Sequence, residues 1–378
     1  MEIHLKYIVM FIGILSMFFA SLPRHRFRYG LETAWLIIFA FLAVRYDFGN
    51  DYLPYKDVFD DINAFNDFLI DKDEHVEAGW QVLCRIFRPF GFQVMIIFLT
   101  AFECFIFYRF IKRYVPERYY WFSIFIFVFN PSLMLVGASM LRNELTIALF
   151  VWSIDFLRDR RLIPYLAITL LSMQFHSSAI VLFFFYVFAY IKNVESKHIV
   201  YAVIFIVYAA LISATSQLGD IIEDVAMLAD EEEALEYYSM DAPVTYVGTG
   251  IGAIISYSIF IYIVFTIFRY PSNTRLLFYI LLIGTFVQPF AAILPAIGRY
   301  SYYFSIFQIA CYPIIWGGAK EQSVLGNRLS SIFESRSIVD LIMLSLIVIM
   351  TLYEYSQFFT NPIWIDKFSE YHTIFELA

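Results

Sequence analysis

The chain has 378 residues, of which 61% are hydrophobic, 20% are aromatic and only 16% are charged. Soluble domains are typically about 45–50% apolar and about 25% charged, so this composition excludes an ordinary soluble enzyme. It also excludes a disordered chain, a disulfide-stapled secreted module and a nucleic-acid-binding protein, which would carry a basic face. We therefore expect a protein that resides in a lipid bilayer.

Apolar segments recur along the whole chain, and a membrane-spanning helix needs roughly 20 mainly apolar residues. We predict an all-α, polytopic membrane protein in which residues 1–378 form a single transmembrane domain with two longer outer loops, 45–90 and 215–248. The sixth and seventh spans are short and could form one broken helix pair. The twelve predicted spans are 7–22, 30–44, 92–110, 119–136, 143–157, 162–175, 178–191, 198–214, 249–268, 276–294, 301–317 and 337–353.

The positions of Lys and Arg predict the orientation of these spans, because cytoplasmic loops carry an excess of both. Every second loop is basic, and these loops together hold 17 of the 26 Lys and Arg residues. Both chain ends are then predicted to lie outside, and an error of one helix pair would leave this parity intact. The basic loops contain Arg24, Arg26, Arg28, Arg109, Lys112, Arg113, Arg118, Arg158, Arg160, Arg161, Lys192, Lys197, Arg269, Arg275, Lys320, Arg328 and Arg336.

The outer loops are acidic. The first holds ten acids between Asp47 and Glu77, together with the amphipathic run FDDINAFNDFLI, which we expect on the membrane surface. The second contains DEEEALEYY, for which solvation of the outer face is a sufficient explanation.

No motif points to a cofactor or a metal. The glycines form neither GxGxxG nor GxxxxGK, so no nucleotide chemistry is indicated. The three cysteines, Cys84, Cys104 and Cys311, lack the spacing of a metal site. Cys104 and Cys311 fall inside apolar segments, and we expect both to be buried core thiols.

Four basic or titratable residues lie on the acid-rich side, against the charge trend. They are Arg45, Arg142, His176 and Arg299, each at the outer end of a different predicted helix. A charge placed at membrane depth is costly and is usually paired or faces a water-filled cavity. Arginine pairs bidentately with phosphate, so a lipid-linked diphosphate at the membrane surface is a natural ligand. Each arginine could instead snorkel or pair with a neighbouring acid, for example Arg45 with Asp47 or Asp51.

Carboxylates and aromatic rings flank the first outer loop. Asp51 is followed by Tyr52 and Tyr55 at a helical spacing, and Glu77 is followed by a Gly79-Trp80 turn. Carboxylates beside Tyr or Trp are a common arrangement for binding sugars, although a capped loop with interfacial aromatics explains each position equally well.

Other polar groups leave their roles open. His176 could act as a general base, as a phosphate partner, or as a structural residue at a helix junction where Ser177 and Ser178 cap the next helix. For Glu103 and Asp155, within or near the ends of apolar spans, we expect hydrogen bonds between helices.

Five short stretches together resemble the EpsG/Wzy-type family of bacterial exopolysaccharide and O-antigen polymerases. In this family Arg-Gln is frequent where this chain has Arg142-Asn143, and Pro or another residue is frequent where this chain has Ala78. The stretches span about two thirds of the chain and are Arg45 to Tyr55 (RYDFGNDYLPY), Glu77 to Trp80 (EAGW), Leu141-Arg142-Asn143 with Ala148, His176 to Ala179 (HSSA) and Gly298-Arg299-Tyr300.

The resemblance implies a membrane glycosyltransferase of GT-C-like architecture in the bacterial cytoplasmic membrane. It would transfer a growing glycan from undecaprenyl diphosphate onto a new lipid-linked repeat unit at the outer face, with membrane lipid around it and no nucleic acid or metal. Whether a partner protein regulates chain length stays open. On this interpretation Arg142, Arg299 and Arg45 bind the diphosphate; His176, Asp51 or Glu77 accepts the proton; and Tyr52, Tyr55, Trp80 and Tyr300 contact the glycan.

Three other functions compete with this one. A flippase for lipid-linked sugars predicts inverted repeats and charged residues along a pathway, whereas no repeat is visible here. A membrane O-acyltransferase could use His176 as its base. A glycan ligase shares the same chemistry and is not separated by these motifs.

Overall fold

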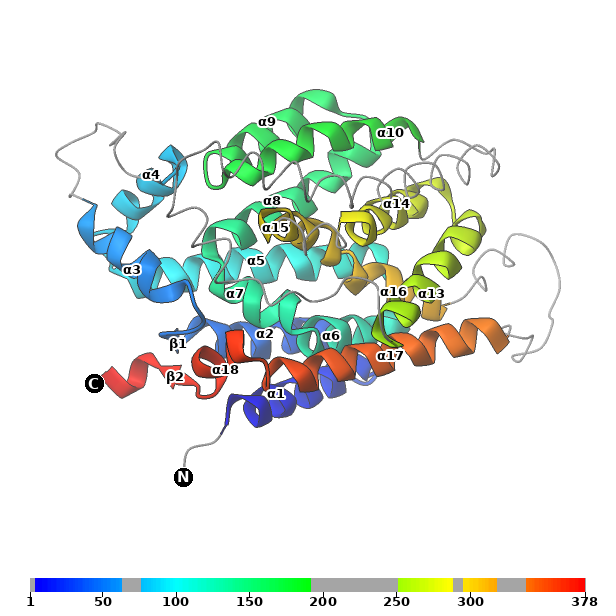
Figure 1. Ribbon diagram of the computed structural model, residues 1–378, viewed down its shortest axis with the longest axis horizontal. Helices are drawn as coiled ribbons and strands as arrows, with labels where there is room; N and C mark the ends of the chain where they lie inside the picture. The colour runs from blue at the N-terminus through cyan, green and yellow to red at the C-terminus, as the bar shows by residue number, and fades with distance from the viewer. Residues whose placement is uncertain (1–3, 63–75, 192–250, 288–294, 318–337, 378) are drawn as a thin grey trace, which may run out of the picture. The chain divides into compact units, whose positions relative to one another are not determined.

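The computed structural model describes residues 4–62, 76–191, 251–287, 295–317 and 338–377. These residues are mostly helical, and two short strands pair near the carboxyl end (Figure 1). The prediction of a helical membrane protein agrees with this architecture. The span at 198–214, the loop at 215–248 and most of the amphipathic run after Phe59 lie outside the described residues.

The number of spans is not confirmed. Within the described part of the chain, two helices are long and apolar enough to cross a membrane, Phe92–Tyr114 and Ile338–Phe358. A third span is obtained if Glu117–Phe129 and Ser132–Ser139, which meet at a 71° bend, are counted as one. Several shorter apolar helices accompany them, so twelve spans remain a prediction.

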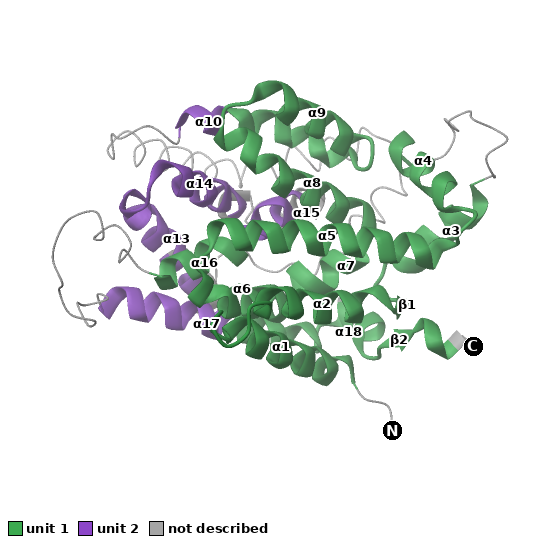
Figure 2. Ribbon diagram, turned by 180° about the vertical axis from the view of Figure 1, so that it is seen from behind, with its two compact units in different colours: residues 1–186, 308–318, 351–378 green, residues 187–307, 319–350 purple. Residues whose placement is uncertain are grey.

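The chain divides into two compact units, which Figure 2 shows in different colours. The first contains residues 1–186, 308–318 and 351–378, and the second contains residues 187–307 and 319–350. The long helix α17 (Ile338–Phe358) begins in the second unit and ends in the first.

The first unit holds the helices around the outer loop. Its α-helices and strands are α1 (Leu5–Ser21), α2 (Gly30–Ala43), β1 (Arg45–Tyr46), α3 (Tyr52–Asp61), α4 (Ala78–Phe87), α5 (Phe92–Tyr114), α6 (Tyr120–Phe129), α7 (Gly137–Ser139), α8 (Leu141–Arg158), α9 (Leu162–Met173), α16 (Gln308–Gly317), α18 (Pro362–Phe368) and β2 (His372–Thr373). Tighter 3-10 turns cover Glu117–Tyr119, Ser177–Val187 and Ile374–Leu377, and Ser132–Val136 is a π-helix.

The described helices of the second unit are mainly apolar. Apart from the first part of α17, they are α10 (Phe188–Ile191), α13 (Ile251–Thr266), a 3-10 turn at Ile267–Arg269, α14 (Ser272–Val287) and α15 (Pro295–Ser305). Gly284 of α14 lies against Phe304 of α15, where an added Cβ would come within 2.6 Å of the Phe304 Cβ.

Aromatic side chains form much of the core of the first unit. Trp35 of α2 lies 4.9 Å from Phe127 of α6, measured between ring centroids. Gly13 lets α1 approach the same helix, because a Cβ there would lie 2.8 Å from the Phe129 ring. Phe127 and Phe129 of α6 are therefore packing residues. Cys84, Cys104 and Cys311 are buried free thiols, as predicted for the latter two.

The bend after α6 positions the start of α8. Pro131 has no N–H to continue the helix, and the Asn130 carboxamide accepts a hydrogen bond from the Ser132 N–H at 3.1 Å. The same side chain donates to Gln308 Oε1 at 3.1 Å. The chain then runs through the π-helix and α7 to Leu141, where α8 begins.

Both ends of the chain lie against the segment that follows α2. β1 pairs antiparallel with β2, with Arg45 opposite Thr373. The Tyr371 ring stacks on Phe41 at 4.6 Å, and Phe48 contacts Phe368 at 5.2 Å. The Leu5 N–H donates to the Ser369 carbonyl at 2.9 Å. Leu5, Ser369 and the segment that follows α2 therefore lie at the same end of the first unit.

Candidate functional site

The carboxylate of Glu77 joins three separate parts of the first unit. Its Oε2 accepts a hydrogen bond from Arg142 Nη1 at 2.5 Å, and its Oε1 accepts one from the Ser177 N–H at 2.8 Å. The Arg142 and Glu77 side chains are 21% and 22% exposed, so the ion pair is reachable from solvent but well shielded. Three of the five stretches singled out in the sequence thus meet at one group.

The backbone of α4 fixes Glu77 in this place. Glu77 precedes α4, which begins at Ala78, so Gly79 lies in the first helical turn and not in the turn predicted before the helix. Gly79 is needed because an added Cβ would lie 2.6 Å from the Gln174 carbonyl oxygen. Next to it, the Trp80 N–H donates to that same carbonyl at 3.2 Å. The end of α9 and the start of α4 are therefore in direct backbone contact.

Arg142 lies in the first turn of α8, as predicted, and contacts α3 as well as Glu77. Its guanidinium carbon lies 5.4 Å from the centroid of the Tyr55 ring. Tyr55 in turn packs against Trp80 at 5.5 Å. One face of Arg142 is thus covered by an aromatic ring while its charge is met by a carboxylate.

His176 lies in the junction between α9 and the 3-10 helix that starts at Ser177. Its Nδ1 accepts the Ser178 N–H at 3.2 Å and lies 2.7 Å from the Ser178 hydroxyl oxygen. An acceptor at Nδ1 places the proton of the neutral ring on Nε2, which is then a hydrogen-bond donor. The adjacent Ser177 N–H is the one bound by Glu77, so His176 directly precedes a residue that contacts the ion pair.

Asp51 precedes α3 at the end of a tightly turned loop. Gly49 has a φ of 79°, and a Cβ there would lie 2.3 Å from Ser139 Oγ, so only glycine fits this approach. The same Ser139 hydroxyl accepts the Asp51 N–H at 3.3 Å. The Tyr55 N–H donates to the Asp51 carbonyl at 3.0 Å, which places the two residues one helical turn apart on one face.

Arg45 lies in the interior and not beside Arg142, contrary to what a direct diphosphate contact requires. Its side chain is 1% exposed. Nη1 donates to the Leu42 carbonyl at 2.5 Å and to Thr100 Oγ1 at 2.7 Å, and Nη2 donates to the Ala138 carbonyl at 3.1 Å. The guanidinium therefore links α2, α5 and α7, with all three contacts made inside the protein.

Two buried carboxylates interact with Arg45, and only one of them, Glu103, is identified from the sequence. Glu103 on α5 and Glu144 on α8 are both buried and interact electrostatically with this arginine. Glu144 packs on Gly137, where a Cβ would lie 2.8 Å from Oε2. The predicted hydrogen bond between helices is not found at Glu103 Oε1, which is buried and has no hydrogen-bond partner among the described residues, and its interaction with Arg45 is electrostatic.

Two of the aromatic residues predicted to contact a glycan are buried. Tyr52 is 2% exposed and donates its hydroxyl to Gln93 Oε1 at 3.1 Å. Burial raises the pKa of Tyr52 to about 12, which keeps this donor neutral. Trp80 is fully buried. Both rings are packing residues in this structure, whereas Tyr55 is half-buried and keeps a face near Arg142.

Arg299 and Tyr300 belong to the second unit. Arg299 is the fifth residue of α15, which begins at Pro295, so it does not open its helix as predicted. Tyr300 follows it and is half-buried. Asp47, in the first unit, has a φ of 42° and lies 4.0 Å from Lys367 Nζ.

Asp155 forms the predicted bonds between helices. Its Oδ1 accepts a hydrogen bond from the Tyr114 hydroxyl at 2.9 Å and forms an ion pair with Arg113 Nε, also at 2.9 Å, and so connects α8 with the end of α5. The described residues contain no group of three or more His, Cys, Asp and Glu side chains that could hold a metal ion.

Residues from three of the stretches that resemble the EpsG/Wzy-type family meet around Glu77. A comparison with known families decides to which family the chain belongs. The EpsG family model matches residues 32–373, nearly the whole chain. The chain belongs to the EpsG family. No curated protein and no solved structure matches this EpsG-family chain.

Membership in the EpsG family supports a membrane protein of exopolysaccharide biosynthesis, of the polymerase type. Within this chain, Ser139 and Gln174 are contacts of the site that no motif indicates. A glycine in the sequence indicates each contact, because Ser139 approaches the backbone at Gly49 and Gln174 approaches it at Gly79.

Proposed function

We propose that this EpsG-family chain polymerises lipid-linked oligosaccharide repeat units at the outer face of the bacterial cytoplasmic membrane. The observation that carries the proposal is the shielded Glu77–Arg142 ion pair, bonded to the Ser177 N–H beside His176. A partly exposed arginine held by one carboxylate can bind a diphosphate through hydrogen bonds from its guanidinium. The family assignment indicates the class of polymer.

In the proposed reaction, a sugar hydroxyl of a new repeat unit attacks the anomeric carbon of the growing glycan. The new glycosidic C–O bond forms as the bond from that carbon to the diphosphate oxygen breaks. Undecaprenyl diphosphate leaves as an anion, and the hydroxyl proton passes to a protein base. Stabilisation of the charge that develops on the leaving group is the main demand on the protein.

We assign that stabilisation to Arg142, with Arg299 as a second candidate. Arg142 is already desolvated on one side by Tyr55 and oriented by Glu77, so it would meet the diphosphate in a fixed geometry. Arg45 becomes a positioning residue in this proposal, because its contacts are with the protein interior.

The hydrogen bonds of His176 change the role that we propose for it. With Nδ1 accepting from Ser178, the neutral ring presents Nε2–H and would donate to a diphosphate oxygen. Asp51 is then the proposed base, because it lies one turn before Tyr55 on the same face of α3. Glu77 is assigned the positioning of Arg142, and Tyr55 and Tyr300 are the glycan contacts that remain.

Reconstitution with a defined substrate tests the proposal. The purified chain in liposomes receives a synthetic undecaprenyl-diphosphate repeat unit, and the products are separated on a gel. A ladder of repeat-unit multiples is expected from the wild type and not from Arg142→Ala, with EDTA without effect. A single transferred product on another acceptor would indicate a ligase, a requirement for an acyl donor an acyltransferase, and movement of substrate without a ladder a flippase.

A further inference from the structure

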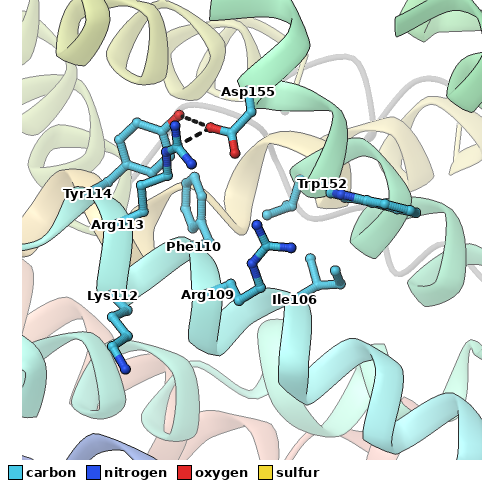
Figure 3. Close-up of a pocket in the computed structure, with 9 residues that line it drawn as sticks. Ile106, Arg109, Phe110, Lys112, Arg113, Tyr114, Trp152 and Asp155 are labelled. Atoms are coloured by element: carbon cyan, nitrogen blue, oxygen red, sulfur yellow. Dashed lines mark hydrogen bonds and ion pairs between the residues drawn. The ribbon is translucent and has the colours of Figure 1, made fainter. Parts of the chain in front are cut away.

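A cavity lies between α5 and α8, about three helical turns from Arg142 along α8 and outside the candidate site. Its volume is about 190 Å³, several times the roughly 30 Å³ that a water molecule occupies in the liquid. Ile106, Phe110 and Trp152 form apolar walls, and Arg109, Arg113 and Asp155 supply the charges (Figure 3). The cavity therefore combines an apolar interior with a charged rim.

One of these cations is not engaged with a carboxylate. Arg113 and Tyr114 both bind Asp155, and Lys112 reaches Glu32 at 2.7 Å. Arg109 has no ion pair or hydrogen bond to any residue in the described ranges, and its guanidinium carbon lies 5.8 Å from the centroid of the Phe105 ring. In Figure 3 the Arg109 side chain points into the space beside Trp152, whereas Lys112 points away from it.

The position of Arg109 along α5 places it at the level of lipid headgroups. α5 is one of the two described helices that are long and apolar enough to span a membrane. Phe98 and Phe105 are exposed on it, Arg109 follows Phe105 by one turn, and Trp152 beside it is 39% exposed. Exposed aromatic residues, with Trp and Arg at the next level along the helix axis, are typical of the place where a helix leaves the hydrocarbon core.

We propose that this cavity binds the phosphate of an anionic membrane phospholipid, with Arg109 as the ligand and the acyl chains along Phe105 and Trp152. A guanidinium without a carboxylate partner has donors for two phosphate oxygens. The cavity is lined by Arg109, Lys112 and Arg113 against the single carboxylate of Asp155, so a zwitterionic headgroup would bring its ammonium to a rim of net positive charge. The net charge of the rim therefore selects an anionic headgroup, independently of the reaction that the protein catalyses.

Lipid titration of the full chain tests this site. Native mass spectrometry counts phosphatidylglycerol or phosphatidylcholine molecules retained by the detergent-purified protein as each lipid is added. We expect the first phosphatidylglycerol to bind more tightly than phosphatidylcholine, and Arg109→Gln to weaken it about fivefold, the effect of one basic residue near a membrane surface. Arg109→Lys should retain part of the affinity, because it keeps the charge and loses the two-point geometry.

Arg28→Gln is the matched control. Its guanidinium lies 5.7 Å over the Tyr29 ring, Arg28 is exposed like Arg109, and it does not line the cavity between α5 and α8. Equal retention of the two lipids by the wild type would overturn the proposal even if Arg109→Gln does not fold. So would an unchanged titration for Arg109→Gln, an equal loss for Arg28→Gln, or binding of soluble glycerol 3-phosphate as tight as that of phosphatidylglycerol.

Discussion

Glu77 and Arg142 form a hydrogen-bonded ion pair, with 2.5 Å between Oε2 and Nη1, although 65 residues separate them in the chain. The other carboxylate oxygen holds the Ser177 N–H, which lies 100 residues from Glu77. Because both side chains are about four-fifths buried, the pair is screened less by solvent than a surface salt bridge. This one carboxylate therefore holds α4, α8 and the junction after α9 in a common arrangement.

Glu77→Ala should lower the free energy of unfolding by about 1.5–3 kcal/mol, because it removes a hydrogen bond between charged groups and leaves the Ser177 N–H without its acceptor. Glu77→Gln keeps the shape and an acceptor, so its loss should be smaller while polymer formation falls at least tenfold. Denaturant titration in detergent micelles measures the first effect, and the length of the glycan ladder measures the second.

Glu117→Gln is the control for this pair, since Glu117 faces Arg24 at 3.9 Å with both side chains exposed. Such pairs contribute little, and we expect a change below about 0.5 kcal/mol with a normal ladder. If Glu77→Gln gave the same result as Glu117→Gln, the assignment of Glu77 to the positioning of Arg142 would be incorrect.

Arg45→Gln should prevent stable folding and not merely reduce activity. It removes donors to Leu42, Thr100 and Ala138 and leaves two buried carboxylates without their cation. The loss of three hydrogen bonds from a buried charged group costs several kcal/mol, at about 1.5–3 kcal/mol for each bond. The yield of monodisperse protein in gel filtration checks the result, with Arg88→Gln, at a half-exposed pair with Asp60, as the neutral comparison. A monodisperse Arg45→Gln protein that makes no polymer would instead favour a direct role in binding the diphosphate.

The sequence predicts the helical membrane class and the residues around Glu77, because charged residues in so apolar a chain need a partner or a ligand. The position of Arg142 at the start of α8 agrees with the structure for a local reason, because the apolar run that follows it marks the start of a helix. Such a feature depends on a few neighbouring residues, so it can be predicted from the sequence.

Burial at the site depends on residues far apart in the chain, so it could not be predicted. Tyr52 is buried because Gln93 receives its hydroxyl, and Arg45 is buried because Thr100 and the Ala138 carbonyl lie within reach. These partners cannot be identified from the spacing or the composition of the sequence near Tyr52 or Arg45. The position of Arg299 within α15 is a smaller error, since the helix begins at Pro295 and not at the arginine.

Gly79→Ala should disrupt the site without touching any charged residue. The new Cβ would lie 2.6 Å from both the carbonyl oxygen and the Cβ of Gln174, so α4 and the junction after α9 must move apart. We expect the Trp80–Gln174 backbone bond to be lost and Ser177 to move away from Glu77, with polymer formation reduced at least tenfold. The ladder assay, normalised to folded protein, measures this.

Gly91→Ala separates this effect from backbone strain. Gly91 has a φ of 90° and nothing within 4 Å of an added Cβ, so alanine there is strained but displaces no neighbour. We expect a loss of stability of about 1–2 kcal/mol and a normal ladder for each folded molecule. Comparable ladders from Gly79→Ala and Gly91→Ala would show that the contact with Gln174 does not position the site.

His176→Gln and Asp51→Asn together distinguish a hydrogen-bond donor from a base. The Ser178 N–H at 3.2 Å from His176 Nδ1 leaves Nε2–H as the donor, and the side-chain amide of glutamine can replace that donor but cannot take a proton near neutral pH. We therefore expect His176→Gln to retain at least a tenth of the wild-type rate with the acidic limb of its pH–rate profile unchanged. Asp51→Asn should lose about 10²–10⁴-fold, the usual contribution of a general base. Initial rates of ladder formation between pH 5 and 9 provide the comparison, and the reverse pattern, with His176→Gln inactive and Asp51→Asn active, would return the role of base to His176.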